Sequence, residues 1–435
     1  MRISFPVKPA SVYWFDSSRI TAEPIRPLLP VTIKYYILGP PESSRYPSLA
    51  IRGPRTNRSF PEPLPLAGLH LEPLVHLIGP ANRAVASYNG VLYALPNPDI
   101  LLSPLATQEA ALSSRIEGAQ ATLGDVLKFE AGEEPAEQSK KSDIQEILNY
   151  RRALWRAQAE LERRPFNLNL LLELHSVLLD NVRGVNRGRG HFRRVQNWIG
   201  APGSEIGQAD FIPPAPARLP ELLDNWEKYY HCDQPDLLVQ LAIVHAQFEI
   251  IHPFVDGNGR LGRILIPLFL FERGTLSRPV FYLSAYIEAH KDEYVFRLRA
   301  LGAGAEAWGN WIEFFLRAVT TQAEANLKTA REISALYDRL KHRVIEITQS
   351  KHAVPLLDAI FTRPIFSSSE FDGRNGMPSR QTIIALLSKL KETGILTTLA
   401  PARGRRPQIL ALPELMNLVE GREVFPPRTP APNAG

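Results

Sequence analysis

The sequence predicts a mainly helical protein that carries one β-hairpin and ends in a small winged-helix domain. Between residues 72 and 340, apolar residues recur at spacings of three and four, the period of one helix face. The segment 190–214 interrupts this run with two β-prone arms around a tip of Gly, Ser and Pro, which is typical of a hairpin. Residues 344–412 then give two helical segments followed by two strand-like segments.

The composition indicates a soluble globular protein with two or three domains. The 435 residues are 44% hydrophobic and 22% charged, and no stretch approaches the roughly 20 apolar residues of a membrane span. The N-terminus lacks the apolar core of a signal peptide, and the single cysteine, Cys232, excludes an internal disulfide framework. We therefore expect a cytoplasmic protein with no membrane partner. The net charge of +5 is compatible with an anionic ligand.

The elements before the C-terminal segment are justified in chain order. Residues 1–66 are rich in proline and have no sustained helical period, so they predict an irregular arm with one short strand at "VTIKYYIL". The helical period then predicts helices over 72–93, 104–129, 142–163, 167–181, 219–230, 237–251, 260–273, 286–301 and 308–340. The hairpin lies between the fourth and fifth of these helices.

The C-terminal segment has the order helix, helix, hairpin, which is that of a winged helix. "LLDAIFTRPIF" predicts the first helix, and "SRQTIIALLSKLKETG" predicts the second, with Ser379 as its N-cap. "ILTTLAPARGRRPQILAL" predicts two strands around a basic loop. Such a module either binds DNA phosphates or docks a protein, and the candidate DNA contacts are Lys389, Lys391, Arg403, Arg405 and Arg406.

These signals divide the chain into five parts. They are an arm (1–66), an N-terminal helical region (67–165), a core (166–330), the winged-helix domain (331–415) and a disordered tail (416–435).

The segment "IHPFVDGNGRLGRILIPLFL", residues 251–270, contains glycines with the spacing of a dinucleotide-binding turn. That turn requires a preceding strand, but the apolar residues upstream, from Leu237 to Ile251, follow a helical period. A Walker loop is excluded as well, because no Lys-Ser/Thr follows the glycines. The segment is therefore a tight glycine turn between two helices.

A zinc site is an alternative interpretation of the same region. His245, Glu249 and His252 are spaced so that one helical face could present all three side chains to a metal. However, Pro253 predicts that the helix ends before it, which would remove His252 from that face. We therefore favour structural roles for His245 and Glu249.

The residue types in the turn fit phosphoryl or nucleotidyl transfer. Gly257 and Gly259 allow successive backbone N–H groups to converge on an anion, and the following helix adds its positive N-terminal end. Arg260 and Arg263 can bind phosphate oxygens, and Asp256 is a hard ligand suited to Mg²⁺. A histidine before these groups, His252, can accept a proton.

"HPFVDGNGRLGR" resembles the Fic motif His-Pro-Phe-x-Asp/Glu-Gly-Asn-Gly-Arg-x-x-Arg at every defined position. The segments "NYRRAL", "ELHSVLL", "GHFRRVQNWIG" and "FIPP" are similar to Fic segments too, so the resemblance extends over about residues 67–412. It implies a Fic-type helical domain, with residues 166–330 as the catalytic core. The implied reaction transfers AMP from ATP to Tyr, Thr or Ser hydroxyls of target proteins, and of the protein itself, and releases pyrophosphate.

The resemblance also implies a role for each motif residue. His252 is the general base, Asp256 holds Mg²⁺, and Phe254 anchors the loop in the core. An anion hole is implied for Gly257, Asn258 and Gly259, and contacts to the β- and γ-phosphates for Arg260 and Arg263. The hairpin corresponds to a flap that binds a target segment by strand addition, through Val195, Ile199, Phe211 and Ile212.

A second stretch, "LSSRIEG" at residues 112–118, resembles the inhibitory motif Ser/Thr-x-x-x-Glu-Gly/Asn of Fic proteins. Ser113 and Glu117 are its defined residues, and the resemblance implies that Glu117 pairs with Arg263 and displaces the γ-phosphate. The alternative is that Glu117 is a solvated residue of an ordinary helix. One departure from the family is Val295, which follows Tyr294 where relatives often have a second tyrosine, so the preference for adenine is open.

Three functions follow from these observations. The leading hypothesis is an auto-inhibited protein adenylyltransferase. The second is removal of AMP from modified proteins, with Glu117 orienting a water molecule. The third is a DNA-binding regulator that senses a nucleotide, although sensing alone requires neither His252 nor Asp256. Expected partners are target proteins; DNA and a second copy of the chain, as a homodimer, are further candidates.

Overall fold

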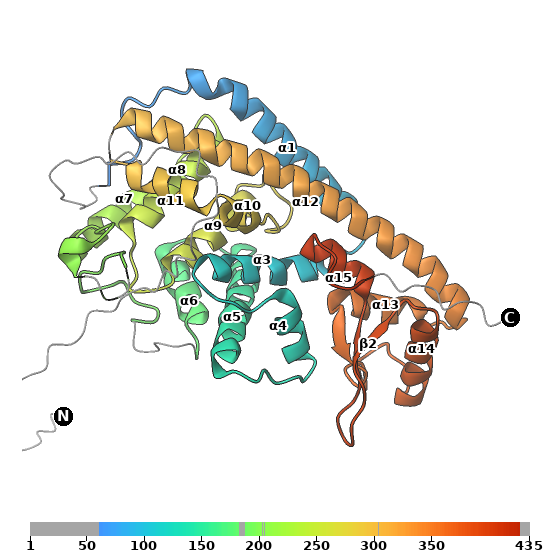
Figure 1. The fold of residues 1–435 in the computed structure, drawn as a ribbon. Coiled ribbons are helices and arrows are strands. Elements are labelled where there is room, and N and C mark those ends of the chain that lie inside the picture. Colours follow the sequence, from blue (N-terminus) through green and yellow to red (C-terminus); the bar gives the residue numbers. More distant parts are fainter. Residues whose placement is uncertain (1–60, 182–187, 202, 204, 303, 427–435) are drawn as a thin grey trace, which may run out of the picture. The chain divides into compact units, whose positions relative to one another are not determined.

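The computed structural model describes residues 61–181, 188–201, 203, 205–302 and 304–426, and it is mainly helical, as predicted (Figure 1). The predicted strand at "VTIKYYIL" lies outside these residues. The helices before the C-terminal segment are α1 (Val75–Ala94), α2 (Pro98–Leu101), α3 (Ser103–Ile116), α4 (Leu123–Glu130), α5 (Gln138–Leu161), α6 (Leu168–Leu178), α7 (Leu219–His231), α8 (Leu237–Ile251), α9 (Asn258–Glu272), α10 (Ser284–Ala289), α11 (Lys291–Ala300) and α12 (Ala305–Thr348).

Helix α8 lies at the centre of the core. Helices α1, α7, α9, α11 and α12 all contact it, so nearly every α8 side chain is buried. The long helix α12 runs beside α1 and also contacts α8 (Figure 1). This packing fixes both ends of the α8–α9 turn, which carries the glycine-rich motif. None of the described helices is long and apolar enough to cross a membrane.

Two predicted helices are each divided in the structure. The one expected over 104–129 is α3 and α4, because Gly118 has a φ of 102° and Thr122 begins α4 with a capping box to Asp125. The one expected over 286–301 is α10 and α11, which meet at His290. The break after α3 matters for function, because it leaves Glu117 at the C-terminal end of α3.

The hairpin predicted over 190–214 is much smaller than expected. Within its described residues, pairing is limited to one antiparallel bridge, in which Ile199 and Phe211 exchange N–H···O bonds of 2.9 and 3.1 Å. The first arm is instead held by the core, because Asn197 donates to the Phe254 carbonyl and Arg193 donates to the His252 carbonyl. Prolines 213 and 214 end the second arm without N–H donors.

The C-terminal segment contains both predicted helices and the predicted hairpin. Its elements are α13 (Ala353–Thr362), β1 (Ile365–Ser367), α14 (Arg380–Glu392), β2 (Thr397–Ala400), β3 (Ile409–Ala411) and α15 (Pro413–Glu420). The three strands form an antiparallel sheet in the order β1-β3-β2, and β1 begins with Ile365 and Phe366, which were predicted to end the first helix. Ser379 caps α14, as predicted, by accepting from the Thr382 N–H.

Helix α15 corrects the predicted start of the tail at residue 416. Pro413 occupies the first turn of α15, and Leu415, Met416 and Val419 are buried. These side chains face the protein because α15 contacts α3 and α12. The packed structure therefore continues through a segment that was expected to be disordered.

Candidate active site

The turn between α8 and α9 begins at His252. Helix α8 ends at Ile251, as Pro253 predicted, and His252 takes the left-handed conformation with φ 49° and ψ 59°. Helix α9 begins at Asn258, two residues earlier than predicted, after Gly257 with φ 81°. A Cβ on Gly257 would also crowd Leu178, at 3.3 Å, so both the conformation and the space favour glycine there.

The side chain of Asn258 stabilises this turn with two hydrogen bonds to the backbone of Phe254. Its Oδ1 accepts from the Phe254 N–H and its Nδ2 donates to the Phe254 carbonyl, both at 2.9 Å. The resemblance implied that Asn258 contributes to the anion hole, but its carboxamide is engaged by Phe254. Phe254 itself is fully buried, consistent with the role of an anchor.

His175 of α6 also supports the turn; it lies in the segment "ELHSVLL", but no role was predicted for it. Its ring stacks on Phe254, with centroids 3.8 Å apart. Nδ1 accepts from the Gly190 N–H at 2.9 Å, so the proton is on Nε2, which donates to the Asp256 carbonyl at 3.0 Å. Burial lowers the pKa of His175 to about 4, and the ring stays neutral at physiological pH.

The two ring nitrogens of His252 have different surroundings. Its Nδ1 lies 3.3 Å from the Glu249 carbonyl, which can only accept, so Nε2 carries the lone pair. This Nε2 is buried and has no hydrogen-bond partner in the described protein. Burial, together with the charge of Arg193, lowers the pKa of His252 to about 4. The ring is therefore neutral and able to take a proton.

Arg193 is a second residue for which no role was predicted, although it lies in the segment "GHFRRVQNWIG". Its Nε donates to the His252 carbonyl at 2.8 Å, and its Nη2 donates to the Pro214 carbonyl at 2.5 Å. Arg193 thus joins the end of α8 to both arms of the predicted flap. Of the flap residues, Val195 is exposed, and Ile199, Phe211 and Ile212 are half-buried.

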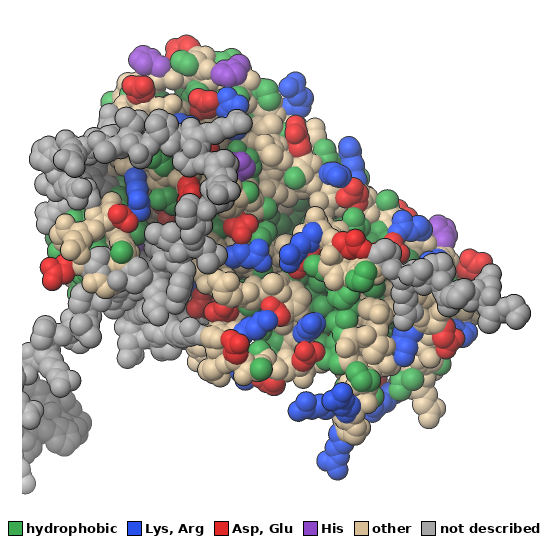
Figure 2. Space-filling model, in the orientation of Figure 1, with side chains coloured by type: hydrophobic (Ala, Val, Ile, Leu, Met, Phe, Trp, Pro, Cys, Tyr) green, Lys and Arg blue, Asp and Glu red, His purple; other side chains and the backbone are tan. Residues whose placement is uncertain are grey.

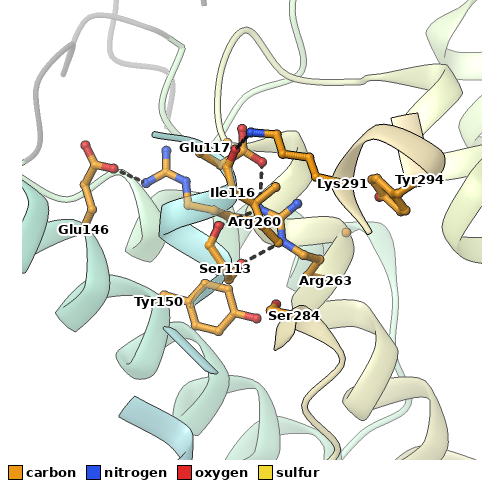
Figure 3. A network of polar contacts seen from close by, with 12 residues as sticks. Ser113, Ile116, Glu117, Glu146, Tyr150, Arg260, Arg263, Ser284, Lys291 and Tyr294 are labelled. Atoms are coloured by element: carbon orange, nitrogen blue, oxygen red, sulfur yellow. Dashed lines mark hydrogen bonds and ion pairs between the residues drawn. The ribbon is translucent and has the colours of Figure 1, made fainter. Parts of the chain in front are cut away.

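Asp256 and Arg260 lie at the N-terminal end of α9. Asp256 Oδ1 accepts from the Gly257 N–H at 2.6 Å and lies 3.6 Å from Arg260 Nη2. Arg260 is buried and also pairs with Glu146 of α5 at 2.9 Å (Figure 3). The guanidinium that was expected on the phosphates is therefore anchored by a carboxylate that the sequence did not predict.

Arg263 binds the segment that resembles the inhibitory motif (Figure 3). Its Nη2 lies 2.7 Å from Glu117 Oε1 and 3.0 Å from the Ser113 carbonyl, and its Nε donates to Ser113 Oγ at 2.8 Å. Burial lowers the pKa of Arg263, but the charge of Glu117 outweighs it and the net shift is upward. The predicted Glu117–Arg263 pair is thus present across 146 positions. The solvated alternative for Glu117 does not describe this structure.

Gly259 is glycine for a different reason from the one expected. It lies within α9, with helical backbone, and needs no unusual φ. A Cβ at this position would collide with Glu117 Oε1 and would lie 3.0 Å from Arg263 Nη1. Gly259 therefore provides the space into which the Glu117 carboxylate fits.

The zinc interpretation finds no support in the geometry. Both ring nitrogens of buried His245 are used, with Nδ1 on the Gly262 carbonyl at 3.1 Å and Nε2 on the Tyr294 hydroxyl at 2.9 Å. The Oε1 atom of Glu249 is buried, and desolvation raises the pKa of Glu249 to about 8. Across the part of the chain that the structure describes, no three His, Cys, Asp or Glu side chains converge as a metal site.

Family models match two adjacent parts of the chain. The model described as "Fic/DOC family N-terminal" matches residues 75–159, and the model "Fic/DOC family" matches residues 165–270. The first match contains Ser113 and Glu117, and the second contains the whole α8–α9 turn.

Curated relatives are similar over part of the chain. A protein adenylyltransferase Fic of Drosophila grimshawi is 32% identical over 133 residues, which are 30% of this chain and 25% of the relative. A probable protein adenylyltransferase of Aquifex aeolicus is 38% identical over 85 residues, which are 19% of this chain and 27% of the relative. The chain thus spans about a quarter of the length of these relatives.

Solved structures resemble the fold at low identity. A Fic family protein from Desulfovibrio desulfuricans is 21% identical with a TM-score of 0.49, covering 78% of this chain and 96% of that one. A Fic-1 fragment from C. elegans is 22% identical with a TM-score of 0.44, covering 61% of this chain and 75% of that one.

Proposed function

Because the chain belongs to the Fic family, we propose that it is a protein adenylyltransferase that its own Glu117 restrains. The observation that carries this proposal is the buried, unpartnered Nε2 of His252. A buried polar atom without a hydrogen-bond partner destabilises the folded protein unless a bound ligand supplies that partner. A target hydroxyl that donates its proton to Nε2 is such a ligand.

The reaction assigns each motif residue a step. The target oxygen attacks the α-phosphorus of ATP, its proton passes to His252 Nε2, and the bond to the leaving pyrophosphate breaks. The first amides of α9 provide N–H donors and the positive helix end for the polyphosphate, whereas the Gly257 N–H, expected in the same role, already donates to Asp256 Oδ1. We assign Arg263 to the γ-phosphate once Glu117 has left it.

The same site would hold Mg²⁺ through Asp256. Mg²⁺ usually takes one or two protein carboxylates and completes its shell with phosphate oxygens and water, so a single carboxylate beside the phosphates fits it. When bound, the ion would neutralise charge on the polyphosphate. Arg260, held between Glu146 and Asp256, would orient the Asp256 carboxylate and add positive charge.

Target proteins would present a hydroxyl along the flap. Ile199 and Phe211 make the one backbone bridge in its described residues, and Val195, on the same arm as Ile199, is 61% exposed. An extended target segment can pair with such an edge and bring Tyr, Thr or Ser to His252. We propose that this takes place in the cytoplasm, where ATP is available and Cys232 stays reduced.

The test is transfer of label from α-labelled ATP. Purified full-length chain with Mg²⁺ should label itself weakly, Glu117→Gly should label itself strongly, and the double variant with His252→Ala should not label. Label from γ-labelled ATP is the control, since AMP transfer leaves none on protein. Label from the γ position, or equal labelling with and without His252, would contradict the proposal.

A second candidate function is removal of AMP from a modified protein. It is favoured by one observation, that the Glu117 carboxylate lies over the N-terminal end of α9 and is still 20% exposed. From there it could orient a water molecule toward a bound AMP ester. Incubating wild type and Glu117→Gly with pre-modified protein separates the two functions, because only removal requires Glu117.

DNA is a candidate partner of the C-terminal segment. Arg403, Arg405 and Arg406, here called the wing arginines, are exposed in the β2–β3 loop, and Figure 2 shows basic side chains gathered at that tip. Such a group could contact backbone phosphates while α14 enters a groove.

A further inference from the structure

The C-terminal segment packs directly on the helix that carries the inhibitory residues. Helices α13 and α15 contact α3, and strand β1 contacts α4. Helix α3 ends at Ile116, immediately before Glu117, so the position of α3 determines where the inhibitory carboxylate lies. A movement of α3 that withdraws Glu117 from Arg263 would also shift α3 against these neighbours.

A chain of polar contacts links this C-terminal segment to α3. Arg363, which follows α13, pairs with Glu370 at 2.7 Å and reaches Glu130 at 3.9 Å. Glu130 is the last residue of α4 and forms a two-armed ion pair with Arg151 of α5. Arg151 in turn donates to Thr107 Oγ1 of α3 at 3.0 Å.

Most of this chain is buried, so its members are coupled more strongly than surface pairs. The side chains of Arg151 and Glu130 are 10% and 13% exposed, and Thr107 is buried. Arg363, at 38% exposure, is the member that reaches solvent. It does so at a cavity of about 660 Å³, whose lining includes Glu130, Arg363, Glu370 and two of the wing arginines, Arg403 and Arg406.

The other side of α3 is fixed to the catalytic core. Glu109 accepts from Tyr150 of α5 and from Ser284 of α10. Lys291 of α11 donates to the Ile116 carbonyl at 2.6 Å (Figure 3). Helix α3 therefore rests between the active site and the C-terminal segment. A change in the C-terminal segment therefore alters contacts of α3 that lie outside the catalytic core.

We propose that the C-terminal segment sets the strength of inhibition, by holding α3 through the chain Arg363–Glu130–Arg151–Thr107. Loss of the Arg363–Glu130 contact would loosen α3. Glu117 would then leave Arg263 more often. This inference rests on the proposed function only for its activity readout, because loosening of α3 can be measured directly.

The experiment compares Arg363→Ala with Arg374→Ala in the full-length chain. Arg374 is the matched control, since it pairs with the same Glu370 at 3.0 Å and is similarly exposed at 42%, but forms no ion pair with Glu130 among the described residues. Hydrogen–deuterium exchange is followed in peptides covering residues 107–121, with a peptide from α8 as the reference. Self-labelling with α-labelled ATP is measured in parallel, in the wild-type and Glu117→Gly backgrounds.

We expect Arg363→Ala to raise exchange at the end of α3, and self-labelling, by about two- to fivefold, as loss of one partly exposed ion pair allows. Arg374→Ala should change neither quantity. In the Glu117→Gly background, Arg363→Ala should not raise self-labelling further, because the inhibitory carboxylate is already absent. Glu130→Gln, which keeps the shape and removes the charge, should raise exchange in α3 more than Arg363→Ala does, because it also breaks the buried pair with Arg151.

Three results would overturn the inference. They are equal exchange in Arg363→Ala and Arg374→Ala, an increase that includes the α8 peptide and so reports general loosening, and an additive effect of Arg363→Ala on Glu117→Gly. If Glu117→Gly gains no labelling, the proposed function fails instead, and the exchange comparison still decides whether the C-terminal segment holds α3.

Discussion

Replacement of Glu117 by glycine is the perturbation that examines most of the site at once. It removes the carboxylate 2.7 Å from Arg263 Nη2 and leaves the other contacts of that guanidinium in place. Ser113 still accepts from Nε at 2.8 Å and offers its carbonyl to Nη2 at 3.0 Å. Arg263 should therefore stay where it is, with one N–H released toward the N-terminal end of α9.

The magnitude follows from the burial of the pair. Arg263 is 2% exposed and Glu117 is 20% exposed, so the contact is a charge-assisted bond in a largely dry site. Such bonds contribute about 1.5 to 3 kcal/mol, which corresponds to about a ten- to a hundredfold gain in AMP transfer when the competitor is removed. Glu117→Gln keeps an acceptor without the charge, and should fall between wild type and Glu117→Gly.

The assay is the initial rate of self-labelling from α-labelled ATP, with the apparent affinity for ATP taken from the same data. Adding Arg263→Ala should abolish the gain, because both changes act through one phosphate contact. The reasoning is refuted if Glu117→Gly stays within twofold of wild type while retaining its fold and nucleotide binding. It is equally refuted if the gain survives in the double variant.

Four further predictions concern the remaining groups. His252→Ala should lower labelling by about a hundred- to ten-thousandfold while leaving ATP binding intact. Because burial lowers the pKa of His252 to about 4, wild-type activity should persist below pH 6.5 and fall only near pH 4. Labelling rates measured across this pH range, with circular dichroism at each pH to check folding, test the second expectation. Asp256→Ala should remove the dependence on Mg²⁺ together with activity, and a variant still stimulated by millimolar Mg²⁺ would show that another group binds the ion. His175→Ala should lower kcat by about tenfold and raise the Mg²⁺ concentration needed, since it releases the Asp256 carbonyl; unchanged Mg²⁺ titrations would limit His175 to a packing role. Neutralising the wing arginines should reduce the slope of log affinity for duplex DNA against log salt by about 0.9 for each lost phosphate contact, and absence of any binding at low salt would favour protein docking.

The parts of the site that were predictable lie within one short stretch of chain. Pro253 indicated the end of α8, and the spacing of the motif placed His252, Asp256 and Arg263 around one turn. The Glu117–Arg263 pair came from resemblance, since no periodicity relates residues 146 positions apart.

The parts that were missed depend on long-range contacts. His175 reaches Asp256 across 81 positions and Glu146 reaches Arg260 across 114, and neither residue is unusual in its own helix. The small size of the flap pairing has the same origin, since Arg193 is committed to a carbonyl 59 positions away. By contrast, the break after α3 was missed although its signal is local, because Gly118 and the capping residues Thr122 and Asp125 mark it in the sequence.

Gly259 connects the glycine-rich motif with the inhibitory contact of Glu117. A helical position has no conformational need for glycine, and glycine there costs up to about 1 kcal/mol relative to alanine. The structure gives a steric reason, because any Cβ would collide with the Glu117 carboxylate. That carboxylate is itself an anion seated at the positive end of α9, against Arg263. On the proposed function, the phosphates of ATP need the same bare surface and the same guanidinium. Inhibitor and nucleotide therefore compete for one site. The space that Gly259 leaves for the phosphates is the same space that the Glu117 carboxylate occupies.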